Sequence, residues 1–155
     1  MKWVQKHKGV IVEGISILFI ILFVYAGLTK LMEGDMFYNN IRNSPILGGR
    51  TMASLGSWLI PLTELSIALL IAWPKTRMIG LYGALALMLL YTGYTVAILF
   101  FAPYIPCSCG GVISLLSWEQ HLVFNIVFLL LVAVSIGLSI KDQKSNNKIE
   151  SIEVS

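Results

Sequence analysis

The residues best suited to chemistry in this sequence are its two cysteines, which stand one residue apart in the stretch "PCSCGG" at residues 106–111. A disulfide between them would close a very small ring, and its Cα separation would fall near the long end of disulfide geometry. Such a bond contributes little stability and, being strained, is easily reduced. The spacing of Cys107 and Cys109 therefore favours a redox role over a structural one.

Two other interpretations of the cysteines stay open. Two thiolates also suit copper(I) or zinc, but the sequence offers few further ligands nearby, chiefly His121 and Glu119. A metal-handling loop is thus an alternative, although we predict no metal ligands. The cysteines could also be incidental in a non-catalytic membrane subunit that docks a larger complex.

A helix start follows the cysteines in the stretch "SWEQ". Ser117 suits the N-cap position, and Gln120 three residues later would complete a capping box. Glu119 in the first turn suits the positive end of the helix dipole. His121 would lie one turn into this helix, where an imidazole can accept a proton, and Asn125 would lie one turn further on the same face.

We assign provisional roles to these groups. Cys109 is nearer in sequence to His121 and precedes two glycines, so we predict that it is the sulfur that attacks the partner. Cys107 follows a proline and is predicted to resolve the mixed disulfide, with His121 assisting proton transfer. The alternative for His121 and Trp118 is that both are ordinary anchors at the membrane interface.

The composition places these residues in a membrane protein. Hydrophobic residues make up 57% of the 155-residue chain and charged residues only 12%, about half the usual share in soluble domains. Four apolar runs cover residues 10–32, 54–73, 78–101 and 121–140, and each approaches or exceeds the length that crosses a bilayer. We therefore predict an all-α, four-helix transmembrane bundle with up-down-up-down topology, formed by residues 1–140 as one domain. Residues 141–155 are predicted to be a polar, disordered cytoplasmic tail.

The basic residues predict the orientation. Because they flank the spans instead of forming a patch, the net charge of +3 does not indicate nucleic-acid binding, and we expect no nucleic-acid partner. With both termini cytoplasmic, the inner side carries more lysine and arginine than the outer side, as the positive-inside rule requires. The inner residues are Lys2, Lys6, Lys8, Lys75, Arg77, Lys141, Lys144 and Lys148, and the outer ones are Lys30, Arg42 and Arg50. This places the cysteine loop on the periplasmic or extracellular side of a bacterial inner membrane. The compartment on that side is oxidising. The first outer loop should contain turns and one short helix.

A glutamate stands inside the second apolar run, in "LIPLTELSIALL". Ionisable residues within spans are costly and mark functional sites by default. Pro61 should kink the helix three residues before Glu64, which suggests a polar pocket facing the bundle interior. The structural alternative is a hydrogen-bonded Glu64, or a pair between Glu64 and Lys30 from the end of the first run.

The third run carries two tyrosines, Tyr91 and Tyr94, each followed by a threonine. These residues could line a pocket for an aromatic ligand such as a quinone, which is the one cofactor we consider. The pattern is more typical of the aromatic belt at a membrane surface. Gly80 and Gly83 on the same run favour close helix packing.

Three stretches together carry a resemblance to a known family: "YAGLTKLMEGDMFYNNIRNSPIL", "PLTELSIALLI" and "CSCGGVISLLSWEQHLVFN". They resemble the MauE branch of the DoxX-like membrane proteins over roughly residues 10–140. The resemblance implies a four-helix inner-membrane protein linked to thiol–disulfide chemistry. The members that give the family its name assist maturation of methylamine dehydrogenase alongside a thioredoxin-like partner.

The bundle is also similar in outline to the quinone-linked disulfide oxidases DsbB and the vitamin K epoxide reductases. Those proteins use two cysteine pairs, whereas this chain has only Cys107 and Cys109. Any relay must therefore use a second protein. The resemblance implies that the pair exchanges disulfides or electrons with an extracytoplasmic thioredoxin-like partner, or with a client during protein maturation.

Overall fold

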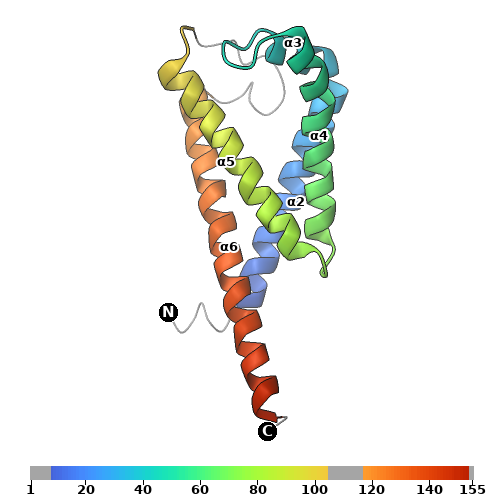
Figure 1. Cartoon of the computed structure of the whole chain (residues 1–155), viewed down its shortest axis with the longest axis vertical. Coiled ribbons are helices and arrows are strands. Elements are labelled where there is room, and N and C mark those ends of the chain that lie inside the picture. The colour runs from blue at the N-terminus through green and yellow to red at the C-terminus, as the bar shows by residue number, and fades with distance from the viewer. Residues whose placement is uncertain (1–7, 105–116, 154–155) are drawn as a thin grey trace.

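The computed structural model describes residues 8–104 and 117–153, and in this part of the chain the helices are joined by turns, without a strand. The helices are α2 (Lys8–Met32), α3 (Gly34–Arg42), α4 (Arg50–Ala72), α5 (Arg77–Phe101) and α6 (Trp118–Glu153) (Figure 1). The predicted all-α class is confirmed. The short helix expected in the first outer loop is α3.

Four helices are long and apolar enough to cross a membrane, in agreement with the four predicted spans. They cover Gly9–Met32, Arg50–Ala72, Arg77–Phe101 and Trp118–Lys141. The second span begins four residues earlier than the apolar run at 54–73, because α4 starts directly after the turn at Gly49. The chain is thus a multi-pass membrane protein whose outer surface contacts lipid.

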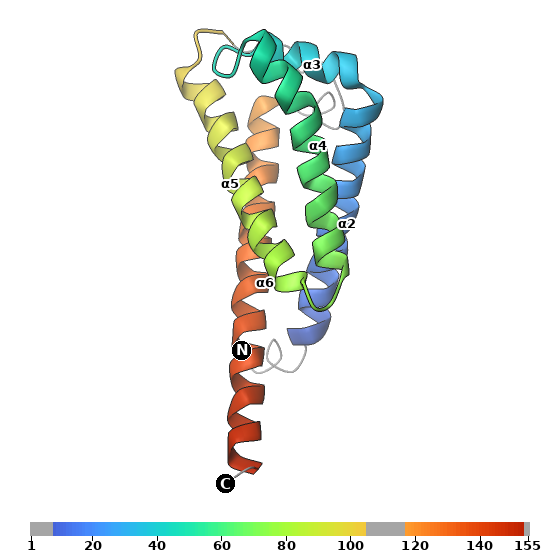
Figure 2. The ribbon, with the colours of Figure 1, turned by 45° about the vertical axis from the view of Figure 1, so that its right-hand side comes forward.

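Several helix ends lie together at one end of the molecule. The end of α2, all of α3, the start of α4, the end of α5 and the start of α6 lie at one end, called here the α3 end (Figures 1 and 2). The turn between α4 and α5 lies well away from it. In the bundle α2 packs against α4 and α6, and α5 packs against the same two helices. Neighbouring helices α2 and α4 run in opposite directions.

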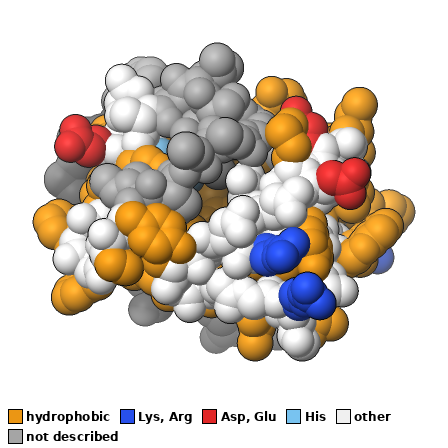
Figure 3. All heavy atoms as spheres, turned by 90° about the horizontal axis from the view of Figure 1, so that it is seen from above, with side chains coloured by type: hydrophobic (Ala, Val, Ile, Leu, Met, Phe, Trp, Pro, Cys, Tyr) orange, Lys and Arg blue, Asp and Glu red, His pale blue; other side chains and the backbone are white. Residues whose placement is uncertain are grey.

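Charged side chains gather at the α3 end. Figure 3 looks onto this end and shows side chains of both signs around it, with hydrophobic side chains at the flanks. The exposed charged residues on the elements that meet there are Asp35, Arg42, Arg50 and Glu119. A polar end on an apolar bundle is what a membrane–water interface requires.

The apolar core lies between the helices, where aromatic side chains of α2 meet the other spans. Phe19 and Phe23 are almost completely buried, and the Phe19 ring packs edge-on against Phe128 at 5.5 Å between centroids. The other fully buried large apolar side chains are Ile71, Leu81, Ile98 and Val132. This core holds the spans together. The outward faces of the helices are apolar too.

Hydroxyl side chains in the spans bond to their own helices. Each Ser or Thr of the following set donates to the carbonyl oxygen four residues earlier, at 2.7–2.8 Å: Ser16, Thr29, Thr63, Ser66, Thr92 and Thr95. This back-bonding satisfies a hydroxyl group without water or a second helix. Polar residues can therefore occupy lipid-exposed positions such as Thr63.

The α4–α5 hairpin is closed by hydrogen bonds and by a glycine. Thr76 Oγ1 donates to the Leu70 carbonyl at 2.9 Å, and the Thr76 N–H donates to the Trp73 carbonyl at 3.1 Å. A Cβ atom added to Gly80 would lie 2.6 Å from the backbone nitrogen of Ile71. The close packing predicted at this glycine is therefore confirmed, because no side chain fits there.

The polar tail differs from expectation. We predicted disorder for residues 141–155, yet α6 continues to Glu153. No glycine or proline interrupts residues 141–153, and several are good helix formers. Extending a helix that already exists requires no new nucleus, so weak propensity is enough to continue it.

A substitution at Gly80 tests the packing of the hairpin. Gly80→Ala should lower the free energy of unfolding by about 1–3 kcal/mol, because α4 and α5 must separate to admit the methyl group. Gly93→Ala on the same helix is the matched control, since nothing lies within 4 Å of its added Cβ. Unfolding in mixed micelles, followed by circular dichroism, measures both. Equal stability of the two variants would contradict the packing described here.

Candidate functional site

Both cysteines lie outside the described residues, in the segment 105–116. The structure does place the two helix termini that this segment connects. The end of α5 and the start of α6 both lie at the α3 end (Figure 1). The roles predicted for Cys107 and Cys109 therefore stay predictions, and the site is built from the helices around them.

The start of α6 carries the capping box predicted from "SWEQ". The Ser117 N–H donates to Gln120 Oε1 at 3.0 Å, and the Gln120 N–H donates back to Ser117 Oγ at 3.3 Å. Glu119 is exposed in the first turn, and Trp118 is half-buried. The cap fixes the direction in which the chain enters α6, and with it the position of His121 one turn later.

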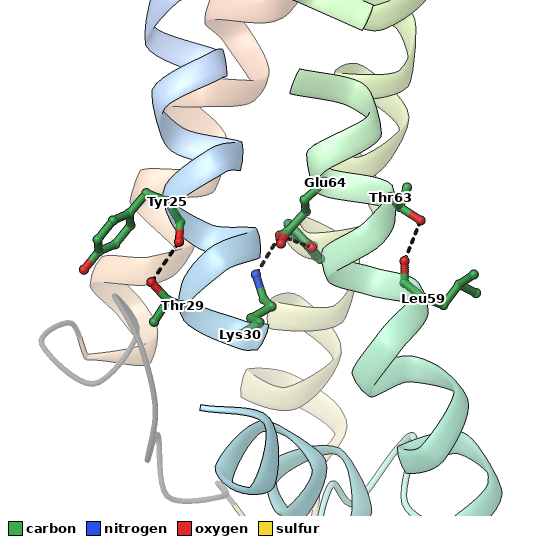
Figure 4. Close-up of polar contacts among 7 residues, drawn as sticks. Tyr25, Thr29, Lys30, Leu59, Thr63 and Glu64 are labelled. Atoms are coloured by element: carbon green, nitrogen blue, oxygen red, sulfur yellow. Dashed lines mark hydrogen bonds and ion pairs between the residues drawn. The ribbon is translucent and has the colours of Figure 1, made fainter. Parts of the chain in front are cut away.

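An ion pair lies inside the bundle between α2 and α4. Glu64 is completely buried, and its Oε1 atom accepts a hydrogen bond from Lys30 Nζ at 2.6 Å. The Tyr91 hydroxyl of α5 donates to the same oxygen at 2.5 Å. Lys30 and Glu64 point toward one another in Figure 4. The structure thus contains the pairing that we gave as the structural interpretation of Glu64, with a tyrosine added to it.

Helix geometry explains why this pair forms. The Cα–Cβ bond of a helical residue tilts toward the helix N-terminus. Because α2 and α4 run in opposite directions, Lys30 leans away from the α3 end and Glu64 leans toward it. A lysine near the end of a span usually extends toward the interface. Lys30 instead extends into the bundle, where the carboxylate compensates its charge.

Aromatic rings surround the ammonium group. Lys30 Nζ lies 5.6 Å from the centroid of the Tyr91 ring and 5.8 Å from that of Phe37, which belongs to α3. Both distances fall within cation–π range. Phe37 was not a predicted site residue, because nothing in the sequence of the loop indicates that α3 folds back over the end of α2.

The same interior receives polar groups from α5 and α6. Asn125 is 2% exposed, and its Nδ2 donates to Thr95 Oγ1 at 3.3 Å. Thr95 in turn donates to the Tyr91 carbonyl, one turn back along α5. Predicted residues from separate helices therefore converge. We call the group Lys30, Glu64, Tyr91, Thr95, His121 and Asn125 the polar cluster.

His121 is the member of the polar cluster nearest the start of α6. Its ring is half-buried and stacks on Phe124, with 6.4 Å between centroids and 9° between planes. The residue lies one turn before Asn125 on α6. His121 Nδ1 is buried and has no hydrogen-bond partner among the described residues.

Tyr94 lies outside the polar cluster and holds a loop. Its hydroxyl is 2.9 Å from Ser44 Oγ, which also accepts the N–H groups of Ile46 and Leu47. Either hydroxyl can donate the hydrogen bond between Ser44 and Tyr94. The structure therefore places the hydroxyls of both Tyr91 and Tyr94 on protein partners.

Two buried polar atoms of the site have no hydrogen-bond partner among the described residues. Glu64 Oε2 is buried without a partner among the described residues, as is His121 Nδ1. Unsatisfied polar atoms in an apolar medium cost free energy, so both atoms reduce the stability of the bundle. Within the described ranges 8–104 and 117–153, no three His, Cys, Asp or Glu side chains are arranged to hold a metal ion.

Removing one charge of the pair tests its energetics. Lys30→Met should lower the free energy of unfolding by about 3 kcal/mol, because Glu64 would remain buried without its counter-charge. Adding Glu64→Gln to this variant should restore most of the loss, since the glutamine keeps an acceptor for Tyr91 and carries no charge. Glu13→Gln, at an exposed position on α2, is the control. A double variant no more stable than Lys30→Met alone would refute the ion-pair account.

Comparison with known proteins agrees with this architecture. The sequence matches the family described as methylamine utilisation protein MauE over residues 8–138, which is most of the chain and includes every member of the polar cluster. No curated protein and no solved structure matches the chain. The match spans all four apolar helices, and the chain belongs to the MauE family of membrane proteins.

Proposed function

We propose that this chain is a thiol–disulfide redox protein of the bacterial inner membrane. Cys107 and Cys109 exchange disulfides or electrons with an extracytoplasmic thioredoxin-like protein, or with a client during its maturation. The observation that carries the proposal is the Cys-Ser-Cys sequence, which holds both cysteines of the chain in the segment between α5 and α6. Membership of the MauE family supports it.

The chemistry needs only the two thiols and a partner with its own pair. A thiolate of this chain attacks a disulfide of the partner, which forms a mixed disulfide and releases one partner thiolate. The second cysteine then attacks the mixed disulfide. The products are a disulfide between Cys107 and Cys109 and a dithiol on the partner, and the reverse sequence oxidises a partner dithiol.

The α3 end is the part of the molecule at which we place this exchange. The helix ends that flank the cysteine segment lie there, together with α3 and the exposed charged residues around it. The positive-inside rule assigns this end to the extracytoplasmic side, which is an oxidising compartment. A soluble thioredoxin-like partner reaches thiols at this end without entering the bilayer.

His121 is the base that we assign to the exchange. The capping box fixes its turn of α6, and the residue lies at the end of the bundle where α5 ends and α6 begins. An imidazole there takes the proton from the attacking thiol and returns it to the leaving thiolate. Glu64 and Lys30 lie deeper and are not assigned a step in this exchange.

Trapping of the mixed disulfide tests the assignment of the two sulfurs. With Cys109 attacking and Cys107 resolving, Cys107→Ser should accumulate a mixed disulfide with the partner, because resolution is lost. Cys109→Ser should accumulate none. Non-reducing electrophoresis followed by mass spectrometry measures both and identifies the partner. Equal trapping by the two variants would refute the roles, and trapping by neither would refute disulfide exchange.

Thiol labelling tests the orientation. After mild reduction, a membrane-impermeant maleimide should label the cysteines in intact spheroplasts. The matched control is Lys75→Cys in the α4–α5 turn, in a background with Cys107→Ser and Cys109→Ser, which should be labelled only after lysis. Labelling of the native cysteines only after lysis, with Lys75→Cys labelled in intact spheroplasts, would reverse the topology. The cysteines would then not face an oxidising compartment.

A further inference from the structure

The α3–α4 loop, residues 43–49, extends from the end of α3 toward the end of α5 (Figures 1 and 2). Its turn is closed by Ser44, whose Oγ accepts the N–H groups of Ile46 and Leu47 at 3.3 and 3.2 Å. Ser44 is 5% exposed, although it belongs to a loop at the surface of the molecule. The loop is therefore a fixed part of the α3 end, to which other segments of the chain can be attached.

Two tyrosines bind consecutive residues of this loop. The Tyr94 hydroxyl, on α5, is hydrogen-bonded to Ser44 Oγ at 2.9 Å, and the Tyr104 hydroxyl, just beyond α5, donates to the Asn43 carbonyl at 3.1 Å. Asn43 is itself fixed at the end of α3, since its N–H donates to the Asn39 carbonyl at 2.9 Å. The chain is thus attached to the loop on both sides of the end of α5.

The place of Tyr104 in the sequence makes this contact important for the thiols. Cys107 and Cys109 follow Tyr104 by three and five residues, whereas Ser117, on the other side, is ten and eight residues away. An extended chain advances at most about 3.6 Å per residue, so the Cα atom of Cys107 lies within about 11 Å of that of Tyr104. Without the contact, the nearest fixed residue would be Phe101 at the end of α5, and the limit would be about 22 Å. The hydrogen bond therefore reduces the volume open to Cys107 about eightfold.

We propose that Tyr104 is a positioning residue for thiol exchange, and that its hydrogen bond to the α3–α4 loop sets where the cysteines are presented to a protein partner. The inference rests on the proposed function, since it concerns the reaction of those cysteines. Tyr104 takes no part in the exchange of bonds. A disulfide on a folded partner approaches in a restricted orientation, so its reaction depends on where the thiol is held. A small disulfide reaches the thiol from many directions.

A comparison of two oxidants measures the effect of Tyr104→Phe, which removes only the hydroxyl. The reduced chain in nanodiscs is mixed with oxidised thioredoxin, a protein disulfide, or with dithiobis(nitrobenzoate), a small one. The products are the disulfide between Cys107 and Cys109 and either the thioredoxin dithiol or two thionitrobenzoates. The rate constant with thioredoxin should fall about fivefold, as expected for one hydrogen bond that competes with water, and the other should not change. An unchanged ratio of the two rate constants would overturn the inference, because a loss of stability or of thiolate lowers both together.

Two further variants serve as controls. Tyr82→Phe alters an exposed tyrosine near the opposite end of α5 and should leave both rate constants unchanged. Tyr94→Phe removes the other contact between α5 and the loop. Because Tyr104 acts through that loop, the double variant should react with thioredoxin no more slowly than Tyr104→Phe alone. Losses that multiply would show that Tyr104 acts by another route and would refute the proposed positioning.

Pulsed electron paramagnetic resonance tests the position of Cys107 without any thiol exchange. One nitroxide is attached to Cys107 in a Cys109→Ser chain, and the other to Met36→Cys, at an exposed position on α3. Tyr104→Phe should widen the distribution of distances about twofold, since the limit set by the chain doubles. Equal widths with and without the hydroxyl would overturn the inference. The expected widening in a chain that oxidised thioredoxin does not oxidise would instead refute the proposed function, and the contact of Tyr104 with the loop would stand without a role in exchange.

Discussion

The complete burial of the Glu64 carboxylate constrains how the other helices of the bundle pack. The desolvation cost of Glu64 is met by an ammonium from α2 and a hydroxyl from α5, so three helices must approach to hydrogen-bonding distance at one oxygen. Each helix can supply its group only if its register is correct. The packing of α2 on α4, and of α5 on α4, is therefore fixed by polar geometry as well as by the fit of apolar side chains.

The polar cluster and the helix ends that flank the cysteine segment lie in the same half of the molecule, at different depths from its α3 end. Reactive thiols in our proposal lie at the aqueous end, where a protein partner reaches them. The buried carboxylate lies within the span, and two aromatic rings lie near the ammonium group that is paired with it. The capped start of α6 links the two levels, since His121 lies between the cap and Asn125 on one helix face.

Hydropathy was sufficient to predict the four spans, because a bilayer admits long apolar helices and little else. The capping box was also predictable, since its signal is confined to residues 117–120. Glu64 stood out as a charge inside a span. Its pairing with Lys30 was one of two alternatives, because sequence alone does not give the rotation of one helix relative to another.

Other features depended on tertiary contacts with no local signal. Tyr91 resembles an interfacial tyrosine in sequence, and only the position of α5 beside α4 directs its hydroxyl to Glu64. Phe37 became part of the site because α3 folds over the end of α2. The continuation of α6 into the polar tail was missed because composition argues for disorder, whereas a preformed helix lowers the cost of adding each further residue.

The hydroxyl groups that bond back to their own helices have a consequence for how the protein enters the membrane during synthesis. Side chains such as Ser16, Thr63 and Thr92 are already satisfied when their helix is alone, so they add little to the cost of inserting each span separately. Lys30 and Glu64 differ, because the partner of each arrives on another span. Lys30 therefore has no counter-charge until the second span is synthesised. Until then we expect its ammonium group to stay near the headgroups or the translocon. Insertion of α2 and α4 is thus expected to be cooperative, as a hairpin-like pair, even though each is apolar enough to insert by itself.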